Sequence, residues 1–583
     1  MPDIRNQACK AINNKTMKKL FSQLNRAEIN IPVTILWFAL AVTYIGGLFV
    51  PLFDDDSAHH AAIALEMYNR GDWACLMDHE NTPYLDKPHF QFWLVALSFQ
   101  LFGVGGFAYK LSSFLFTLLG VWATYRLALH LCGRKAALYA ALILASSAAF
   151  VLANIDVRMD AILTACIALA VWQGVMHLDT GKVRYLLGAA LGMAMAFGTK
   201  GWIGVMVPFF ALVFYIARQR QWRWFLSWRF LLLLAAFALF ISPVLYAYYL
   251  QFDAHPELAV RGETGVSGVR FILWGQIFDR MGGTFGTTGA NDPFFFLHTL
   301  LWAVLPWSFL FYVLLVKKVV EVSKGQSPAS PVYWLTVPAI LLTIAALSVS
   351  QFKLPHYLNV VFPLLAIFVA AVLTEPKTER FLRGIGIMQK VITVGLLVGV
   401  IALNYFCFPP VRWSFSLLLA VLMVYVLYLL FYRTASVHNM VVTGVLLSAV
   451  VWFSLNFNFY PQLLTYQGGN QLAETVRARG ISPEDIGAYH ITPGDIGYSF
   501  DVYVGRVVNE WSDATIRERL AEGKPVYLVV EEGGVADLRS AGYAFDFVDA
   551  KRDYRITRLN AAFLNPATRD TKLTKLYLVK LIE

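Results

Sequence analysis

The fold of this chain is decided by residues 31–56, which read IPVTILWFALAVTYIGGLFVPLFDDD. The part from Ile31 to Pro51 is strongly apolar, and about 20 such residues are enough to cross a bilayer as a helix. Three carboxylates, Asp54, Asp55 and Asp56, follow it closely. Because charge at a membrane face costs free energy unless something uses it, this pattern predicts a spanning helix with a functional site at its exit.

The composition predicts a polytopic α-helical membrane protein. The 583 residues are 58% hydrophobic and 15% charged, whereas an ordinary soluble domain is about 25% charged. The net charge of +10 comes from basic residues in short loops between apolar segments, so it does not indicate nucleic-acid binding. The five cysteines are scattered and predict no disulfide framework. The first apolar run lacks a clear small-residue cleavage site, so we expect it to be retained.

Apolar length predicts about thirteen membrane spans. They are residues 31–52, 107–131, 135–153, 159–178, 183–200, 201–218, 229–251, 297–317, 332–350, 356–374, 389–409, 411–432 and 437–458. The apolar segment 89–102 is too short to span easily, and we expect a re-entrant or interfacial helix there.

The distribution of Lys and Arg orients these spans. With the N-terminus in the cytoplasm, the inner loops are short and rich in basic residues, and the outer loops are longer and poorer in them. The same orientation places every acidic cluster outside, and an odd number of spans places the C-terminus outside. We therefore expect a membrane protein with a cytoplasmic N-terminus and a C-terminal domain on the outer side.

Three regions follow from this reading. Residues 1–30 are a cytoplasmic N-terminus, either an amphipathic helix on the inner leaflet or a solvated tail. Residues 31–459 form the transmembrane domain, whose first outer loop, 53–106, includes a surface helix at 57–69. Residues 460–583 have the composition of a soluble domain, and we expect a small α/β fold. Its predicted strands and helices are 526–530, 576–581, 471–479 and 514–521.

Polar motifs recur at the edges of the apolar stretches. They are Ala64-Leu65-Glu66-Met67, Gly71-Asp72-Trp73, Tyr84-Leu85-Asp86-Lys87-Pro88-His89, Phe92-Trp93, Asp160, Thr199-Lys200-Gly201, Pro306-Trp307 and Lys353-Leu354-Pro355-His356-Tyr357. With the acidic cluster, they resemble the membrane glycosyltransferases of the GT-C superfamily over residues 30–375. The likeness is to the branch of the lipid A aminoarabinose transferases and relatives of the protein O-mannosyltransferases.

The resemblance implies a GT-C fold and an inverting glycosyltransferase. Such an enzyme moves a sugar from undecaprenyl phosphate, a polyprenyl phosphate, to an acceptor at the periplasmic face of the membrane. The resemblance thus implies a multi-pass protein of the bacterial inner membrane whose C-terminal domain is periplasmic. Lipid A, in an aminoarabinose-type transfer, is the first candidate acceptor, and protein hydroxyls or another surface glycan are the alternatives. A secondary transporter is the rival class, but we find no internal repeat, and the ionisable residues cluster at one face. A surface receptor would leave the charged motifs unexplained.

The chain departs from the family pattern at two acids. Aligning the family's Asp-Glu motif places its Asp on Asp56 and its Glu on Ser57, so the second acid is missing and Asp55 is its candidate substitute. The family's Glu-Lys-Pro reads Asp86-Lys87-Pro88 here. In the aminoarabinose branch the acid at that position helps to hold a metal, so Asp86 with His59 or His60 is the candidate set for a divalent ion. No other cofactor is implied.

The chemistry selects further candidates. A departing lipid phosphate gains negative charge, which fixed cations stabilise, and the candidates for this role are Lys87, Lys200, Arg280 and Lys353, although each alone also fits a snorkelling residue. For a hydroxyl acceptor the candidate general base is Asp56, followed by Asp160. For a phosphate acceptor Asp56 would instead orient the sugar, bind an amino group on it or hold a cation. The other interpretation of the acidic cluster is a helix cap.

The remaining predicted positions belong to a substrate pocket. They are Tyr84, Asp86, Arg158, His356 and Tyr357. For the two tyrosines an interfacial anchor is the alternative interpretation.

Overall fold

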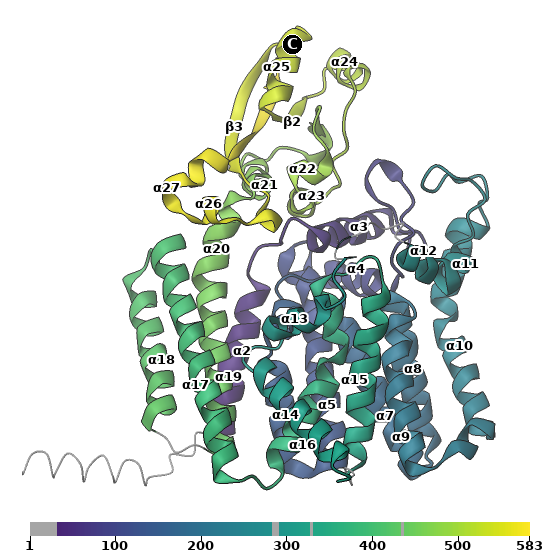
Figure 1. The fold of residues 1–583 in the computed structure, drawn as a ribbon. Coiled ribbons are helices and arrows are strands. Elements are labelled where there is room, and N and C mark those ends of the chain that lie inside the picture. Colours follow the sequence, from purple (N-terminus) through teal and green to yellow (C-terminus); the bar gives the residue numbers. More distant parts are fainter. Residues whose placement is uncertain (1–31, 283–287, 289–290, 327–329, 433–435, 583) are drawn as a thin grey trace, which may run out of the picture.

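The computed structural model describes residues 32–282, 288, 291–326, 330–432 and 436–582. The predicted amphipathic helix near the N-terminus lies outside these residues. Figure 1 shows a bundle of helices with a smaller α/β part above one end. The bundle contains α2 (Val33–Leu48), α5 (Gly106–Ala145), α7 (Asp160–Thr180), α8 (Val183–Lys200), α9 (Ile203–Gln219), α10 (Trp228–Tyr248), α13 (Phe295–Ala303), α14 (Ser308–Ser323), α15 (Pro331–Val349), α16 (Phe362–Thr374), α17 (Glu379–Ala402), α18 (Trp413–Tyr432) and α19 (Val437–Ser454).

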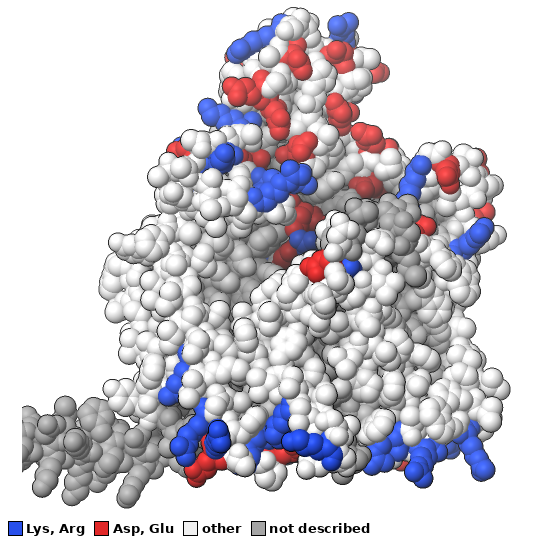
Figure 2. All heavy atoms as spheres, viewed as in Figure 1, with Lys and Arg blue, Asp and Glu red and all other residues white. Residues whose placement is uncertain are grey.

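Within the residues that the structure describes, eight helices are long and apolar enough to cross a membrane. The shorter apolar helices are α2, α9 and α4 (Phe90–Phe102). The membrane-protein fold is therefore confirmed, whereas the number of thirteen spans is not established. On the face shown in Figure 2, a broad belt with few charges covers the helices, and Lys and Arg gather along its lower edge.

Two predicted spans merge and another one is broken. The predicted spans 107–131 and 135–153 fall largely on α5, which bends at Gly133. Gly133 has a φ of 82°, a conformation that glycine adopts readily because it has no Cβ. The predicted span 297–317 is divided into α13 and α14 by residues 304–307, where Pro306 lacks the amide hydrogen of a regular helix.

The first outer loop contains two helices, α3 and α4. The first, α3 (Asp56–Arg70), coincides with the predicted surface helix and starts at Asp55, whose side chain accepts a hydrogen bond from the Ser57 amide. The second, α4, packs against α3 through an apolar cluster that includes Ile63, Leu65 and Phe92. This packing fixes the acidic cluster relative to the bundle.

The α/β part is built on a four-stranded sheet with the order β1-β2-β4-β3. Strand β1 (Ile486–Ala488) is parallel to β2 (Tyr527–Glu531), while β4 (Thr574–Leu581) is antiparallel to both β2 and β3 (Phe545–Asp553). Strands β2 and β4 overlap the two predicted strands. The predicted helices at 471–479 and 514–521 overlap α21 (Gly468–Ala478) and α24 (Asp513–Ala521). A further helix, α23 (Tyr498–Val504), packs on α3.

Candidate active site

A cavity of about 190 Å³ lies where the first outer loop meets the ends of several bundle helices. Asp56 comes from the start of α3, Arg158 precedes α7, Lys200 ends α8, and His356 and Tyr357 lie in the 3₁₀ helix η5 (Pro355–Val361). The lining residues are Asp56, His59, His60, Tyr84, Asp86, Lys87, Arg158, Lys200, Phe352, Leu354, His356 and Tyr357. Most of the positions selected from the sequence are therefore brought together.

Four predicted residues are placed differently. Asp55 and Asp160 bind Arg158 and Lys200, which line the cavity, but are not themselves in its lining. Lys353 is buried outside the lining found among the described residues, where its Nζ donates to the Asp292 carbonyl at 3.0 Å. Arg280 belongs to α12 (Gln276–Gly282), and its side chain is not among the described ones.

Arg158 is bound by three carboxylates. Its Nε donates to Asp156 at 2.8 Å, its Nη1 to Asp56 at 3.2 Å, and its Nη2 to Asp55. Burial alone would lower the pKa of Arg158, but these carboxylates raise that pKa above its usual value. One guanidinium thus binds two of the three acids that follow α2, Asp55 and Asp56.

The three consecutive acids, Asp54, Asp55 and Asp56, have different partners and different exposure. Asp54 accepts a hydrogen bond from the Ser499 amide at 2.8 Å, and Asp55 caps α3, as the interpretation of a helix cap predicts. Asp56 is the one that lines the cavity, and its side chain is 52% exposed. Of this cluster, Asp56 is therefore the carboxylate that a substrate can reach.

Lys200 and Asp160 form a buried ion pair. The Lys200 Nζ lies 2.8 Å from Asp160 Oδ1 and 4.7 Å from the centre of the Tyr357 ring. The other carboxylate oxygen lies 3.9 Å from His356 Nε2. A buried charge without a partner is strongly unfavourable, so each member of the pair fixes the other. Asp160 holds the ammonium group of Lys200 at the wall of the cavity.

Asp86, His59 and His60, the predicted metal set, all line the cavity, but their side chains have other partners. Asp86 pairs with Arg261 instead, and its carbonyl accepts a hydrogen bond from Gln276 at 2.9 Å. His59 Nε2 is bound to Asp78 at 2.7 Å. Burial and the neighbouring cations lower the pKa of His60 well below its usual value. Among the side chains that the structure describes, no group of three or more His, Cys, Asp and Glu is placed to hold a metal ion.

Three residues that support the site were missed in the sequence. Lys110, inside α5, is fully buried and donates to the carbonyls of Gly47 at 3.3 Å and Val50 at 2.7 Å, at the end of α2. A lone lysine in an apolar helix is a detectable signal. Asp78 and His79 were also missed, and no motif marks them.

The sequence comparisons find one matching family model and several relatives. Residues 86–246 match the model of the family described as dolichyl-phosphate-mannose-protein mannosyltransferase. The undecaprenyl phosphate-alpha-4-amino-4-deoxy-L-arabinose arabinosyl transferase of Pseudomonas aeruginosa is 28% identical over 54% of this chain and 53% of its own length. The corresponding protein of Edwardsiella ictaluri is 27% identical over 63% of this chain and 64% of its own length. The chain thus spans about half to two thirds of these relatives.

The structural comparison covers nearly the whole chain. The crystal structure of ArnT from Cupriavidus metallidurans bound to undecaprenyl phosphate matches 94% of this chain and 97% of its own, with a TM-score of 0.68 and 18% identity. The apo structure of the same protein matches with a TM-score of 0.67. At this identity the likeness concerns the fold. This chain therefore has the fold of ArnT and is similar in sequence to the undecaprenyl phosphate-aminoarabinose transferases, as the GT-C resemblance predicted.

Proposed function

We propose that this protein is an inverting glycosyltransferase. It moves a sugar from undecaprenyl phosphate to an acceptor at the periplasmic face of the bacterial inner membrane, and aminoarabinose-type transfer to lipid A is the favoured reaction. The observation that carries the proposal is the cavity in which the cations Lys87, Arg158 and Lys200 lie together with the carboxylate of Asp56. The names of the relatives and the shared fold support it.

The proposed orientation follows from the charges. The basic edge of the bundle in Figure 2 suits the cytoplasmic side. The cavity and the α/β part, residues 460–583, then belong to the periplasm, and residues 1–30 to the cytoplasm. A polyprenyl donor whose tail lies in the bilayer brings its phosphate to the level at which the helices of the bundle end.

In the proposed step the bond between the anomeric carbon and the phosphate oxygen breaks, and the oxygen leaves with the electron pair. An acceptor oxygen attacks the opposite face of the sugar and forms the new bond, which inverts the configuration. Lys200 and Lys87 stabilise the negative charge that grows on the leaving phosphate. Lys200 is suited to this role because Asp160 and Tyr357 fix its position before the substrate arrives.

The role of Asp56 depends on the acceptor. A hydroxyl must lose its proton as it attacks, and Asp56 accepts that proton as general base. A phosphate on lipid A is already ionised, so no proton need move, and Asp56 then orients the sugar or binds a positively charged amino group on it. Arg158 keeps the Asp56 carboxylate in place in both cases.

The test is reconstitution of the purified protein with undecaprenyl phosphate-linked 4-amino-4-deoxy-L-arabinose and lipid A. We expect a product with the mass of lipid A plus one sugar, and free undecaprenyl phosphate in equal amount. Mass spectrometry of lipid A and of surface proteins, from cells with and without the chain, identifies the acceptor. A mass loss on proteins alone would replace lipid A by a protein acceptor, and no loss in either class would contradict the proposal.

A further inference from the structure

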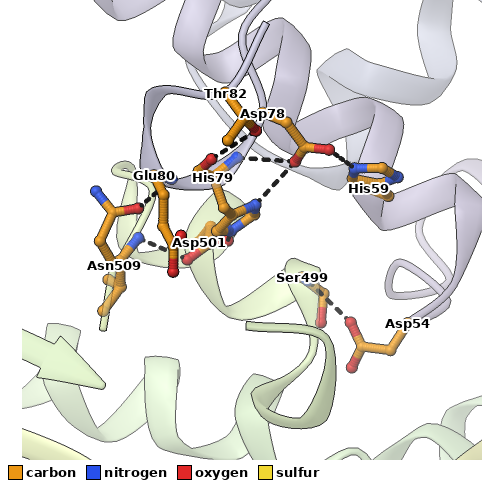
Figure 3. Close-up of polar contacts among 10 residues, drawn as sticks. Asp54, His59, Asp78, His79, Glu80, Thr82, Ser499, Asp501 and Asn509 are labelled. Atoms are coloured by element: carbon orange, nitrogen blue, oxygen red, sulfur yellow. Dashed lines mark hydrogen bonds and ion pairs between the residues drawn. The ribbon is translucent and has the colours of Figure 1, made fainter. Parts of the chain in front are cut away.

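A relay of four side chains, His59, Asp78, His79 and Asp501, leads from the cavity into the α/β part (Figure 3). His59, which lines the cavity, contacts Asp78 through Nε2 at 2.7 Å. The other oxygen of Asp78 lies 3.1 Å from Nδ1 of His79. Nε2 of His79 lies 2.7 Å from Asp501 of α23. Three short contacts therefore connect a wall of the cavity with a residue that is 422 positions away from His79 in sequence.

The inner members of this relay, His79 and Asp501, are buried and paired. His79 is 9% exposed and Asp501 is 3% exposed. Burial alone would lower the pKa of His79, but its hydrogen bonds to Asp501 and Asp78 raise that pKa to about 9. A buried carboxylate such as Asp501 is strongly unfavourable without a partner. The cationic form of His79, between two carboxylates, is therefore the arrangement that satisfies all three groups.

The α/β part also touches His59 directly. The Tyr498 ring, at the start of α23, stacks on the His59 ring with centroids 4.5 Å apart and an angle of 26° between the planes. Asp78 holds one edge of His59 while Tyr498 covers its face. Because a carboxylate only accepts, Nε2 of His59 carries the proton of the bond to Asp78. Nδ1 is then the nitrogen that remains for other partners.

Two neighbouring contacts also join the first outer loop to the α/β part, and they differ from this relay of side chains. The Asp54 carboxylate accepts from the Ser499 amide at 2.8 Å, and Asn509 accepts from the Glu80 amide at 2.9 Å (Figure 3). These contacts hold the α/β part on the first outer loop but do not reach His59. The relay and Tyr498 do reach it, so they add orientation to attachment.

We propose that Asp501, His79 and Asp78 are positioning residues that fix the His59 ring at the cavity, so that the C-terminal α/β part completes the transferase site. This inference rests on the proposed function, since it assigns His59 to the same reaction. His59 presents Nδ1 to the phosphate or hydroxyl that reacts, and its orientation depends on the distant Asp501.

A double-mutant cycle tests the relay in the purified full-length protein. Asp501→Asn keeps the size of the side chain but removes the charge that binds His79. With undecaprenyl phosphate-linked 4-amino-4-deoxy-L-arabinose and lipid A, we expect kcat to fall on the order of ten- to a hundredfold, because small misplacements are costly. KM for the donor should change little. His59→Gln should lose at least as much, and the double variant should lose no more than His59→Gln alone. Additive losses would overturn the relay.

A second measurement does not depend on activity. Diethyl pyrocarbonate modifies imidazole nitrogens, and mass spectrometry gives its rate at His59. We expect Asp501→Asn and Asp78→Asn to change this rate severalfold. If the wild-type protein shows no transfer, the proposed function fails, and this labelling still decides the relay. An unchanged rate at His59 in both variants would overturn it.

Matched controls come from the same α/β part. Asp537 forms a similar pair with His490 at 2.8 Å, but both side chains are about half exposed. Asp537→Asn should leave turnover and His59 labelling as in the wild type. Asn509→Ala removes a docking contact without touching the relay and should also leave His59 labelling unchanged. The labelling rate of His490 reports whether Asp501→Asn has unfolded the part, and Asp78→Asn breaks the relay from the side of the bundle.

Discussion

At the scale of single residues, the chemistry depends on which carboxylate remains available to a substrate. Asp54 and Asp55 are occupied by Ser499, by Arg158 and by the first turn of α3. Asp56 faces the cavity, where Arg158 holds it from one side. One acid of a run of three is therefore free to act, although the sequence presents them as equals.

Asp56→Asn should reduce transfer by about a hundredfold or more, whether Asp56 acts as general base for a hydroxyl acceptor or orients the sugar for a phosphate acceptor. The amide keeps the shape of the side chain but loses its charge and basicity. Turnover is measured with the purified variant, and circular dichroism checks its folding. Glu66→Gln is the control because Glu66 lies on the same helix and pairs with Arg70 on the surface. Wild-type turnover in Asp56→Asn would leave that carboxylate without a catalytic role.

Lys200→Met should reduce both activity and stability. The Asp160 carboxylate would stay buried without its cation, a loss of about 3–5 kcal/mol in the free energy of unfolding. The double variant Lys200→Met/Asp160→Asn should recover stability, because it removes the unpaired charge, but should not recover turnover. Thermal unfolding and turnover are compared in the three proteins. Recovery of turnover in the double variant would show that Lys200 acts only through stability.

At the scale of elements, the end of α2 is held by a lysine from another helix. The ammonium group of Lys110 donates hydrogen bonds to backbone carbonyls at the point where α2 ends and the acidic loop begins. Without it, those carbonyls would be buried with fewer hydrogen-bond donors. The position of the loop that contains Asp56 is therefore coupled to the packing of α5.

Lys110→Met should lower the free energy of unfolding by about 1–3 kcal/mol, the cost of leaving a buried polar group unsatisfied. We also expect lower turnover, since the loop after α2 loses its anchor. Lys135→Met is the matched control because Lys135 belongs to the same helix and is exposed. Equal melting temperatures of the two variants would contradict the role of Lys110.

At the scale of the whole molecule, the α/β part and the bundle share a charged contact that responds to pH. The pKa of His79 is raised to about 9 in the folded protein, above the usual value of 6.5. Its contribution to stability is therefore fully present below about pH 6.5 and is lost as the pH rises through about 9. Unfolding of the wild type should become easier between pH 7 and pH 10. Asp501→Asn should flatten this dependence, and an identical pH profile in both proteins would contradict the assignment.

The orientation in the membrane is a further prediction at this scale. A reporter that is active only in the cytoplasm, fused after Glu583, should give no signal, because the distribution of Lys and Arg places the C-terminus outside. A periplasmic reporter at the same position should be active. The opposite pair of results would reverse the topology.

The sequence predicts the fold better than the connections within the site. Apolar length locates nearly every long helix, and the motifs around Asp56, Lys87, Lys200 and His356 bring out residues that line one cavity. The pairing of Asp86 with Arg261 could not be predicted, because the two are 175 positions apart and no periodicity links them. The contact between His79 and Asp501 is hidden for the same reason. Strand β3 was missed because five of its nine residues are charged, and its sequence, FDFVDAKRD, breaks the alternation of apolar and polar residues that indicates a strand.

The contact between Asp54 and Ser499 has a consequence for biogenesis. The first outer loop precedes the α/β part in the sequence, so a ribosome makes most of this chain before the two can meet. A nascent or truncated chain would carry the loop but lack the Ser499 amide that binds Asp54. On the proposed function, the protein would then acquire its activity late in its synthesis, and half-inserted chains would not consume lipid-linked sugar.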